Sequence, residues 1–166
     1  MPPAPFRRRP RNEVDVASFQ TALDPARLTL LGRLSHEAAP NHRGRLRLVV
    51  TRTVAALEGR ADCWWWNPAG LPLAEALAAM IPGGGAVAVP GGQDIFDLIG
   101  ADGVDEVPLA RATRVRMGAG RGLFVACEAG LAARDVLAAG GLVADAPLWL
   151  DEPAGVSLTI WRRVPA

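Results

Sequence analysis

The sequence lacks lysine and tyrosine altogether. All 18 basic residues are arginine, so two common catalytic residue types are removed from the candidates. The formal net charge is +1, which gives no electrostatic case for nucleic-acid binding or for attachment to a membrane surface. We therefore expect neither nucleic acid nor membrane as a partner.

Cysteine and histidine are scarce. Two cysteines, Cys63 and Cys127, do not predict a disulfide framework and fit a reducing compartment. The sequence contains no CxxC pair, and its two histidines are His36 and His42, so no metal site is predicted.

Long apolar runs are missing too. None approaches the roughly 20 residues that a membrane-spanning helix needs. The first segment, "MPPAPFRRRPRN", is rich in proline and arginine and has no apolar stretch typical of a secretory signal. We expect a flexible tail over residues 1–12, a single domain over residues 13–166, and a cytoplasmic protein.

Strand-like and helix-like patterns alternate along most of the chain. Helical patterns are followed or preceded by short apolar or β-branched runs. Adjacent strand residues face opposite ways, so Trp64–Trp66 is expected to pack in the core and at an edge, and not to form one ligand platform. The order predicts an α/β fold with a mostly parallel central sheet, helices on both faces and a C-terminal antiparallel hairpin. The helices are expected at 14–23, 33–39, 71–80 and 93–99, and the strands at 28–31, 45–52, 62–66, 86–89, 104–110, 141–150 and 155–163.

Two strand-glycine-helix junctions are candidate ligand sites. "LTLLGRLSHE" and "AVAVPGGQDIF" each direct backbone N–H groups and a helix dipole toward the carboxyl ends of the strands, where phosphate binds in such sheets. A third strand ends in "VVTR", which supplies a hydroxyl and a guanidinium. Ser35, His36 and Glu37 would project in different directions from a helix start, so they are not predicted to form a catalytic relay.

These motifs, taken in order, resemble the dihydrofolate reductase family. The motifs are "DVASF", "GRLSHE", "GRLRLVVTR" and "GGQDIF", with the hairpin at the end, and they span Asp15 to about Arg163. "VRMGAGRGLF" is also similar to the related reductase domain of riboflavin biosynthesis. The segment before Asp15 is short and proline-rich, so we expect no counterpart of the family's first strand and closing loop.

The resemblance implies a set of binding residues for NADPH and a pterin. Asp15 would be the catalytic residue, holding the pterin ring and favouring the protonated substrate through a water relay. Phe19 would pack on the ring, and Arg45 would bind the substrate carboxylate. The remaining matched positions would bind NADPH through its phosphates, its adenosine end and its nicotinamide: Gly32, Arg33, Leu34, Ser35, Thr51, Arg52, Gly91, Gly92, Gln93 and Asp94.

The activity implied is NADPH-dependent hydride transfer to C6 of a dihydropterin, with protonation at N5, in one-carbon metabolism. The substrate would be dihydrofolate or dihydromethanopterin. Two alternatives stay open. One is a pyrimidine reductase of the riboflavin type, which would not need Asp15 or Arg45; the other is a non-catalytic protein that binds a nucleotide or a pterin. A homodimer also stays open.

Overall fold

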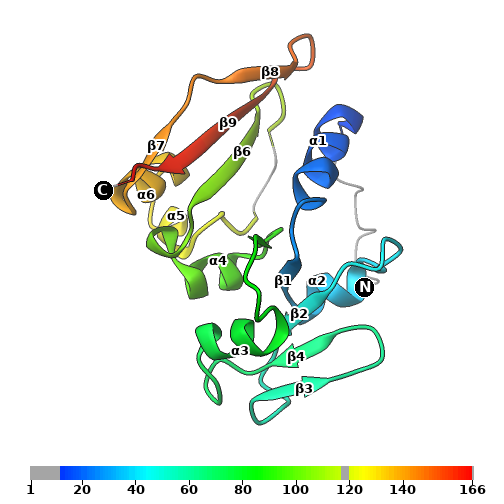
Figure 1. The fold of residues 1–166 in the computed structure, drawn as a ribbon. Helices are drawn as coiled ribbons and strands as arrows, with labels where there is room; N and C mark the ends of the chain where they lie inside the picture. The colour runs from blue at the N-terminus through cyan, green and yellow to red at the C-terminus, as the bar shows by residue number, and fades with distance from the viewer. Residues whose placement is uncertain (1–11, 117–119, 166) are drawn as a thin grey trace, which may run out of the picture.

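The computed structural model describes residues 12–116 and 120–165, which form nine strands in two sheets with helices around and between them (Figure 1). The predicted tail lies outside the described residues, apart from Asn12, whose side chain caps the first helix. Part of "VRMGAGRGLF", residues 117–119, also lies outside them.

The first sheet is mostly parallel. Its strand order is β3-β4-β2-β1-β5, in which β1 pairs in parallel with β2 and β5, β2 pairs in parallel with β4, and β3 is antiparallel to β4. This sheet confirms the predicted mostly parallel arrangement. Its strands are β1 (Leu28–Gly32), β2 (Arg47–Val50), β3 (Leu57–Gly59), β4 (Trp64–Trp66) and β5 (Val87–Ala88).

The second sheet is antiparallel and is built around β9 (Val156–Arg163), which pairs with β6 (Glu106–Ala112), β7 (Leu142–Ala144) and β8 (Leu148–Asp151). The β8–β9 hairpin confirms the predicted C-terminal hairpin. The apolar run expected as one strand is divided into β7 and β8 at residues 145–147, where Pro147 cannot donate to a ladder. Pro108 lies in the edge strand β6 and is paired in regular register with Ile160, so the edge position tolerates it without a bulge.

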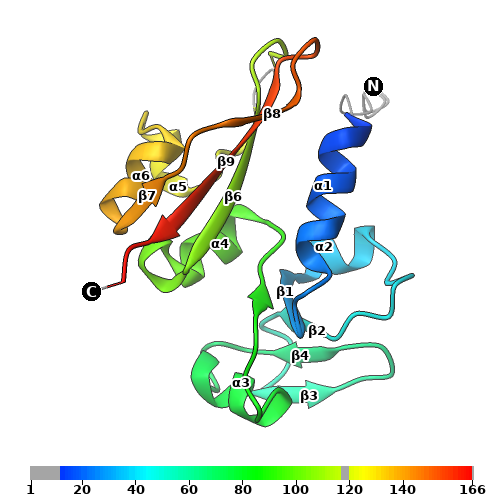
Figure 2. The same ribbon diagram turned by 45° about the horizontal axis from the view of Figure 1, so that its top comes forward.

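The four predicted helices are present, and two further short ones were not predicted. α1 runs from the first sheet toward the β8–β9 turn, where the Asn12 side chain donates a 2.7 Å hydrogen bond to Asp151 (Figure 2). None of the helices in residues 12–116 and 120–165 is long and apolar enough to cross a membrane. The helices are α1 (Glu13–Leu23), α2 (Arg33–Ala38), α3 (Leu73–Met80), α4 (Gln93–Ile99), α5 (Val125–Glu128) and α6 (Ala133–Ala139), with a 3₁₀ turn, η1, at Ala101–Gly103.

Alternation along β1, β2 and β4 gives the first sheet two different faces. Leu30, Leu48 and Trp66 point to one face, where they pack against α3 and α4 through Ala76 and Ile95. The opposite face carries Thr29, Leu31, Arg47 and Val49, and α1 and α2 lie against it. Helices therefore cover both faces, as predicted.

A second apolar cluster lies under the antiparallel sheet. Phe124, Leu137 and Leu142 are buried there with Ala101, and Phe96 of α4 packs against them. The neighbouring residue Ile95 belongs to the core of the first sheet. α4 therefore lies between the two sheets and contributes to both cores (Figure 1).

The tryptophan triplet is distributed as the alternation requires. Trp66 is 2% exposed and donates a 2.8 Å hydrogen bond to the Leu71 carbonyl. Trp65 points to the other face, where the Arg60 guanidinium lies 3.9 Å from its ring centre. Trp64, the first residue of β4, is 39% exposed. No single aromatic platform is formed by the three.

We expect Trp66→Ala to lower the free energy of unfolding by about 3–5 kcal/mol, because it empties the centre of the first core. Trp64→Ala, at the partly exposed first residue of the same strand, should cost less than about 1 kcal/mol. Urea unfolding of both variants measures the difference. Equal losses would contradict the assignment of Trp66 to the core.

Candidate functional site

A cleft of about 360 Å³ opens on the Thr29 face of the first sheet. α1 and α2 form two of its walls, β1 and β2 form its floor, and the segment that follows β5 closes another side. The lining residues are Phe19, Gln20, Leu23, Thr29, Leu31, Ser35, Ala39, Arg45, Arg47, Pro90, Gly91 and Gly92.

The lining combines apolar surface with positive charge. Phe19, Leu23 and Leu31 supply flat and branched apolar contacts, and the two arginines Arg45 and Arg47 supply the charge. No aspartate or glutamate occurs among the described lining residues. Such a cleft suits a flat, polar ligand that presents hydrogen-bond acceptors or carries negative charge.

Thr29 has a buried hydroxyl with no partner. The residue is 5% exposed, and its Oγ1 makes no hydrogen bond within the described structure. A buried polar group without a partner costs about 1–3 kcal/mol, so such groups are rare unless a ligand completes them. Thr29 lines the cleft, but its Oγ1 is sealed from solvent, so a ligand would reach this hydroxyl only after the side chain rotates.

Arg47 extends from β2 beneath α2. Its Nη1 donates hydrogen bonds to the Ala39 carbonyl at 2.7 Å and to His36 Nδ1 at 3.2 Å. Burial lowers the pKa of Arg47. Both contacts are with neutral groups, so the guanidinium charge in the cleft is not balanced by a carboxylate in direct contact among the described residues.

Arg45, by contrast, is engaged with the end of α1. It donates to the Gln20 side chain at 3.0 Å, to the Gln20 carbonyl at 3.1 Å and to the Asp24 carboxylate at 2.6 Å. Arg43 donates to the same carboxylate at 2.9 Å. The hydrogen bonds from Arg45 and Arg43 hold the pKa of Asp24 below its ordinary value. Arg45 therefore ties α1 to the segment before β2, in addition to lining the cleft.

Gly91 and Gly92 bring bare backbone to the cleft. Their φ angles are +148° and +104°, a region that residues with side chains rarely adopt. Gly92 is also the N-cap of α4, and no side chain caps it. The chain can therefore pass close to a ligand at the point where α4 begins.

Five of the predicted site residues meet at this cleft: Phe19, Ser35, Arg45, Gly91 and Gly92. The other eight do not line it. Their ligand roles stay predictions. They are Asp15, Gly32, Arg33, Leu34, Thr51, Arg52, Gln93 and Asp94.

Several of these eight have partners inside the protein. Arg33 forms a 2.8 Å ion pair with Glu37 on the surface of α2. The buried Thr51 hydroxyl lies 2.9 Å from that of Thr53. The Gln93 amide donates to Glu128 at 2.9 Å.

Two of the remaining five have side-chain or packing contacts. The Asp94 carboxylate accepts from Arg121 at 2.7 Å, and Gly32 lies against Ile95, on the core side of the first sheet. Leu34 and Arg52 are exposed, and Asp15 is half-buried.

Thr29 and Arg47 were not predicted as site residues. The signal for them lay in the alternation: each is a polar residue within an apolar strand, and the two are direct partners in the β1–β2 register. Polar residues paired across adjacent strands share a face, which marks that face as something other than core.

Comparison with known proteins supports the fold. No protein-family model matches the chain, and no curated protein matches it. The chain is similar to a solved structure, a riboflavin biosynthesis protein from Shewanella sp. PV-4, with a TM-score of 0.60 and 17% identity over 98% of this chain and 84% of that one. The fold is dihydrofolate reductase-like. In this fold the present chain places its cleft beside the paired glycines, on the Thr29 face of the parallel sheet.

We expect Thr29→Val to raise the free energy of unfolding by about 1 kcal/mol, because it removes a buried hydroxyl without a partner and keeps the shape of the side chain. Thr51→Val is the matched control, since the Thr51 hydroxyl is also buried but has a partner, and its loss should be destabilising. Urea unfolding of the unliganded protein distinguishes the two. Destabilisation by Thr29→Val would mean that the hydroxyl stabilises the fold itself.

The Asp24 carboxylate should make stability depend on pH. Because its pKa is lower in the folded than in the unfolded state, its contribution is complete above the unfolded value and is lost as the pH falls through the folded value. Wild type should therefore lose more stability than Asp24→Asn between about pH 5 and about pH 2. Asp105→Asn, at a surface carboxylate without an ion pair among the described residues, should follow wild type. Parallel curves for all three proteins would refute the role of Asp24.

Proposed function

We propose that the chain is an NADPH-dependent reductase of a small nitrogen heterocycle, and that its substrate is a pyrimidine of the riboflavin type. The observation that carries the proposal is the composition of the cleft. It combines apolar walls, two guanidinium groups and a glycine pair, and it has no carboxylate among its described lining residues.

NADPH fits the residues on the cleft wall. Gly91 and Gly92 have no side chains to obstruct a cofactor, and the Ser35 hydroxyl lies in the same cleft. Exposed Arg52, which follows β2, and surface Arg33 offer positive charge for phosphate groups nearby. When bound, NADPH supplies a hydride, and the protein supplies position and electrostatics.

The substrate class follows from the groups that can face it. Recognition of a pterin ring, as the family resemblance implies it, needs the Asp15 carboxylate, yet Asp15 does not line the cleft. A pyrimidine with carbonyl oxygens needs donors instead, and the Arg47 guanidinium is a donor on this face. The name of the similar structure, a riboflavin biosynthesis protein, supports the same choice.

The chain's own residues would position the substrate and exclude water. Phe19 offers a ring to pack on the heterocycle, and Leu23 and Leu31 cover its edge. The Arg47 guanidinium would hold a carbonyl oxygen or another site of negative charge. Reduction of a dihydropterin is the second candidate. It is favoured by the motif order from Asp15 to the hairpin and requires Asp15 to reach the substrate.

Turnover assays separate these activities. The oxidation of NADPH is followed by its absorbance with an aminopyrimidine precursor of riboflavin, with dihydrofolate and with dihydromethanopterin as alternative substrates. We expect turnover with the pyrimidine. Asp15→Asn should change kcat/KM by less than about twofold, whereas Arg47→Met should lower it about 10- to 100-fold, because a charge-assisted hydrogen bond is lost.

Two results would overturn this assignment. Turnover of a pterin that is abolished by Asp15→Asn would identify a dihydropterin reductase. Tight NADPH binding without turnover of any of the three substrates would identify a non-catalytic binding protein. Circular dichroism of each variant confirms that the fold is intact.

A further inference from the structure

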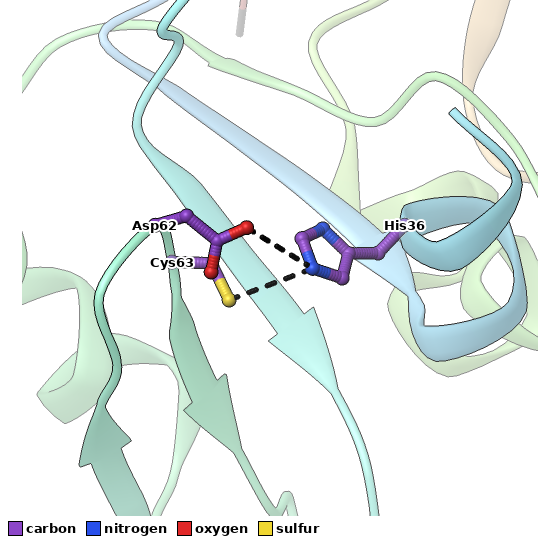
Figure 3. A group of neighbouring side chains, drawn as sticks. All are labelled: His36, Asp62 and Cys63. Atoms are coloured by element: carbon purple, nitrogen blue, oxygen red, sulfur yellow. Dashed lines mark hydrogen bonds and ion pairs between the residues drawn. The ribbon is translucent and has the colours of Figure 1, made fainter. Parts of the chain in front are cut away.

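A second group of chemically active side chains lies outside the cleft. His36 extends from α2, while Asp62 and Cys63 come from the turn that connects β3 to β4 (Figure 3). His36 Nε2 lies 3.7 Å from an Asp62 carboxylate oxygen and 3.7 Å from Cys63 Sγ. The three donor atoms lie within 4.8 Å of one another, so they converge on one small volume.

These separations are close to those around a tetrahedral metal ion. With Zn–N and Zn–O bonds of about 2.0 Å and a Zn–S bond of about 2.3 Å, tetrahedral geometry places nitrogen about 3.6 Å from sulfur and about 3.3 Å from oxygen. The two His36 distances need shifts of a few tenths of an ångström, whereas the Asp62 oxygen, within 4.8 Å of the Cys63 sulfur, must move to about 3.5 Å from it. The exposed carboxylate of Asp62 can make such a shift at little cost.

Burial is graded across the cluster. Cys63 is 3% exposed, the His36 side chain is 13% exposed, and the Asp62 side chain is 64% exposed. A cation could therefore arrive from the Asp62 side. The sulfur and the imidazole would hold it against the protein, and a fourth coordination position would face solvent.

We propose that His36, Asp62 and Cys63 form a binding site for a borderline divalent cation such as Zn²⁺, with water in the fourth position. One nitrogen, one carboxylate oxygen and one thiolate are a donor set for Zn²⁺ and its neighbours, and the sulfur disfavours Mg²⁺ and Ca²⁺. The thiolate and the carboxylate together balance the charge of the ion, so the occupied site is formally neutral.

The surroundings of Cys63 suit metal binding better than free-thiol chemistry. The Trp65 indole N–H lies 3.0 Å from Sγ and can donate to a metal-bound thiolate. Cys63 must give up its thiol proton to bind the cation, because the thiolate is the metal ligand.

Arg47 connects the proposed site to the cleft. Arg47 is a donor, so its hydrogen bond to His36 requires that Nδ1 be unprotonated and that the ring proton sit on Nε2. A metal on Nε2 moves that proton to Nδ1, and the Arg47–His36 hydrogen bond must then break. Arg47 keeps its 2.7 Å bond to the Ala39 carbonyl and meets no net charge in the occupied site.

Cobalt provides the direct test, because Co²⁺ bound to a thiolate gives a charge-transfer band in the near ultraviolet that reports the sulfur ligand. We expect one equivalent of Co²⁺ to produce this band in the 166-residue chain and Zn²⁺ to abolish it. Cys63→Ser should eliminate the band, and Asp62→Asn and His36→Gln should weaken binding at least about tenfold. The chain supplies its own controls: Cys127→Ser and His42→Asn should bind like wild type.

Several results would overturn the proposed metal site. Absence of the band in wild type at excess Co²⁺, or a band that survives Cys63→Ser and disappears in Cys127→Ser, would exclude the site. Because Cys63 is buried, Cys63→Ser could destabilise the protein. Asp62→Asn, at the surface, tests the site without this effect. Unchanged Co²⁺ affinity in both Asp62→Asn and His36→Gln would also exclude it.

A second arm tests the link to Arg47. Arg47→Met frees His36 Nδ1 to carry a proton, so we expect its Co²⁺ affinity to be severalfold higher than that of wild type. An unchanged or weaker affinity would show that the Arg47–His36 hydrogen bond does not oppose metal binding and would overturn the proposed link. Because neither arm uses NADPH or a substrate, failure of the proposed reductase activity leaves both results interpretable.

Discussion

The register of β1 against β2 and β4 is the constraint on which the rest of the structure depends. Parallel pairing places Leu30 beside Leu48 and Leu48 beside Trp64, and it places Thr29 beside Arg47. Alternation then separates an apolar face, which packs on α3 and α4, from a mixed face, which carries the cleft. A slip of one residue would exchange the two faces and bury a guanidinium in the core. The same register therefore stabilises the fold and exposes its site.

Most of the elements could be predicted because their signals are local. Leu28–Leu31 and the "RLRLVVTR" segment are strands by alternation and β-branching, and α3 shows helical periodicity after Pro72. The elements that were missed have weak local signals. β3 is three residues long, and α5 and α6 lie in a segment rich in alanine and glycine, where neither period stands out. The division of the strands into two sheets depends on pairing over long distances, which periodicity does not report.

The candidate site was predictable in part for the same reason. The Gly91-Gly92 pair is a local backbone signal, and the structure places it at the cleft. The unpartnered Thr29 hydroxyl could not be predicted from the sequence, because it depends on which distant residues pack around Thr29 in the folded chain. His36 and Cys63 are 27 residues apart and belong to no known metal-binding motif. Their contact in the folded protein could therefore not be predicted from residue spacing. Their proximity comes from α2 lying over the edge of β4.

α4 links the two halves of the molecule mechanically. Its consecutive residues Ile95 and Phe96 lie in different cores, and its first turn begins at Gly92 in the cleft. Unfolding of either core would expose one apolar side of this helix to water. The two sheets are therefore expected to unfold as a single cooperative unit, although they share no strand. A rotation of one sheet relative to the other must likewise turn α4 and move the glycine pair. The geometry of the cleft is thus set by the angle between the two sheets.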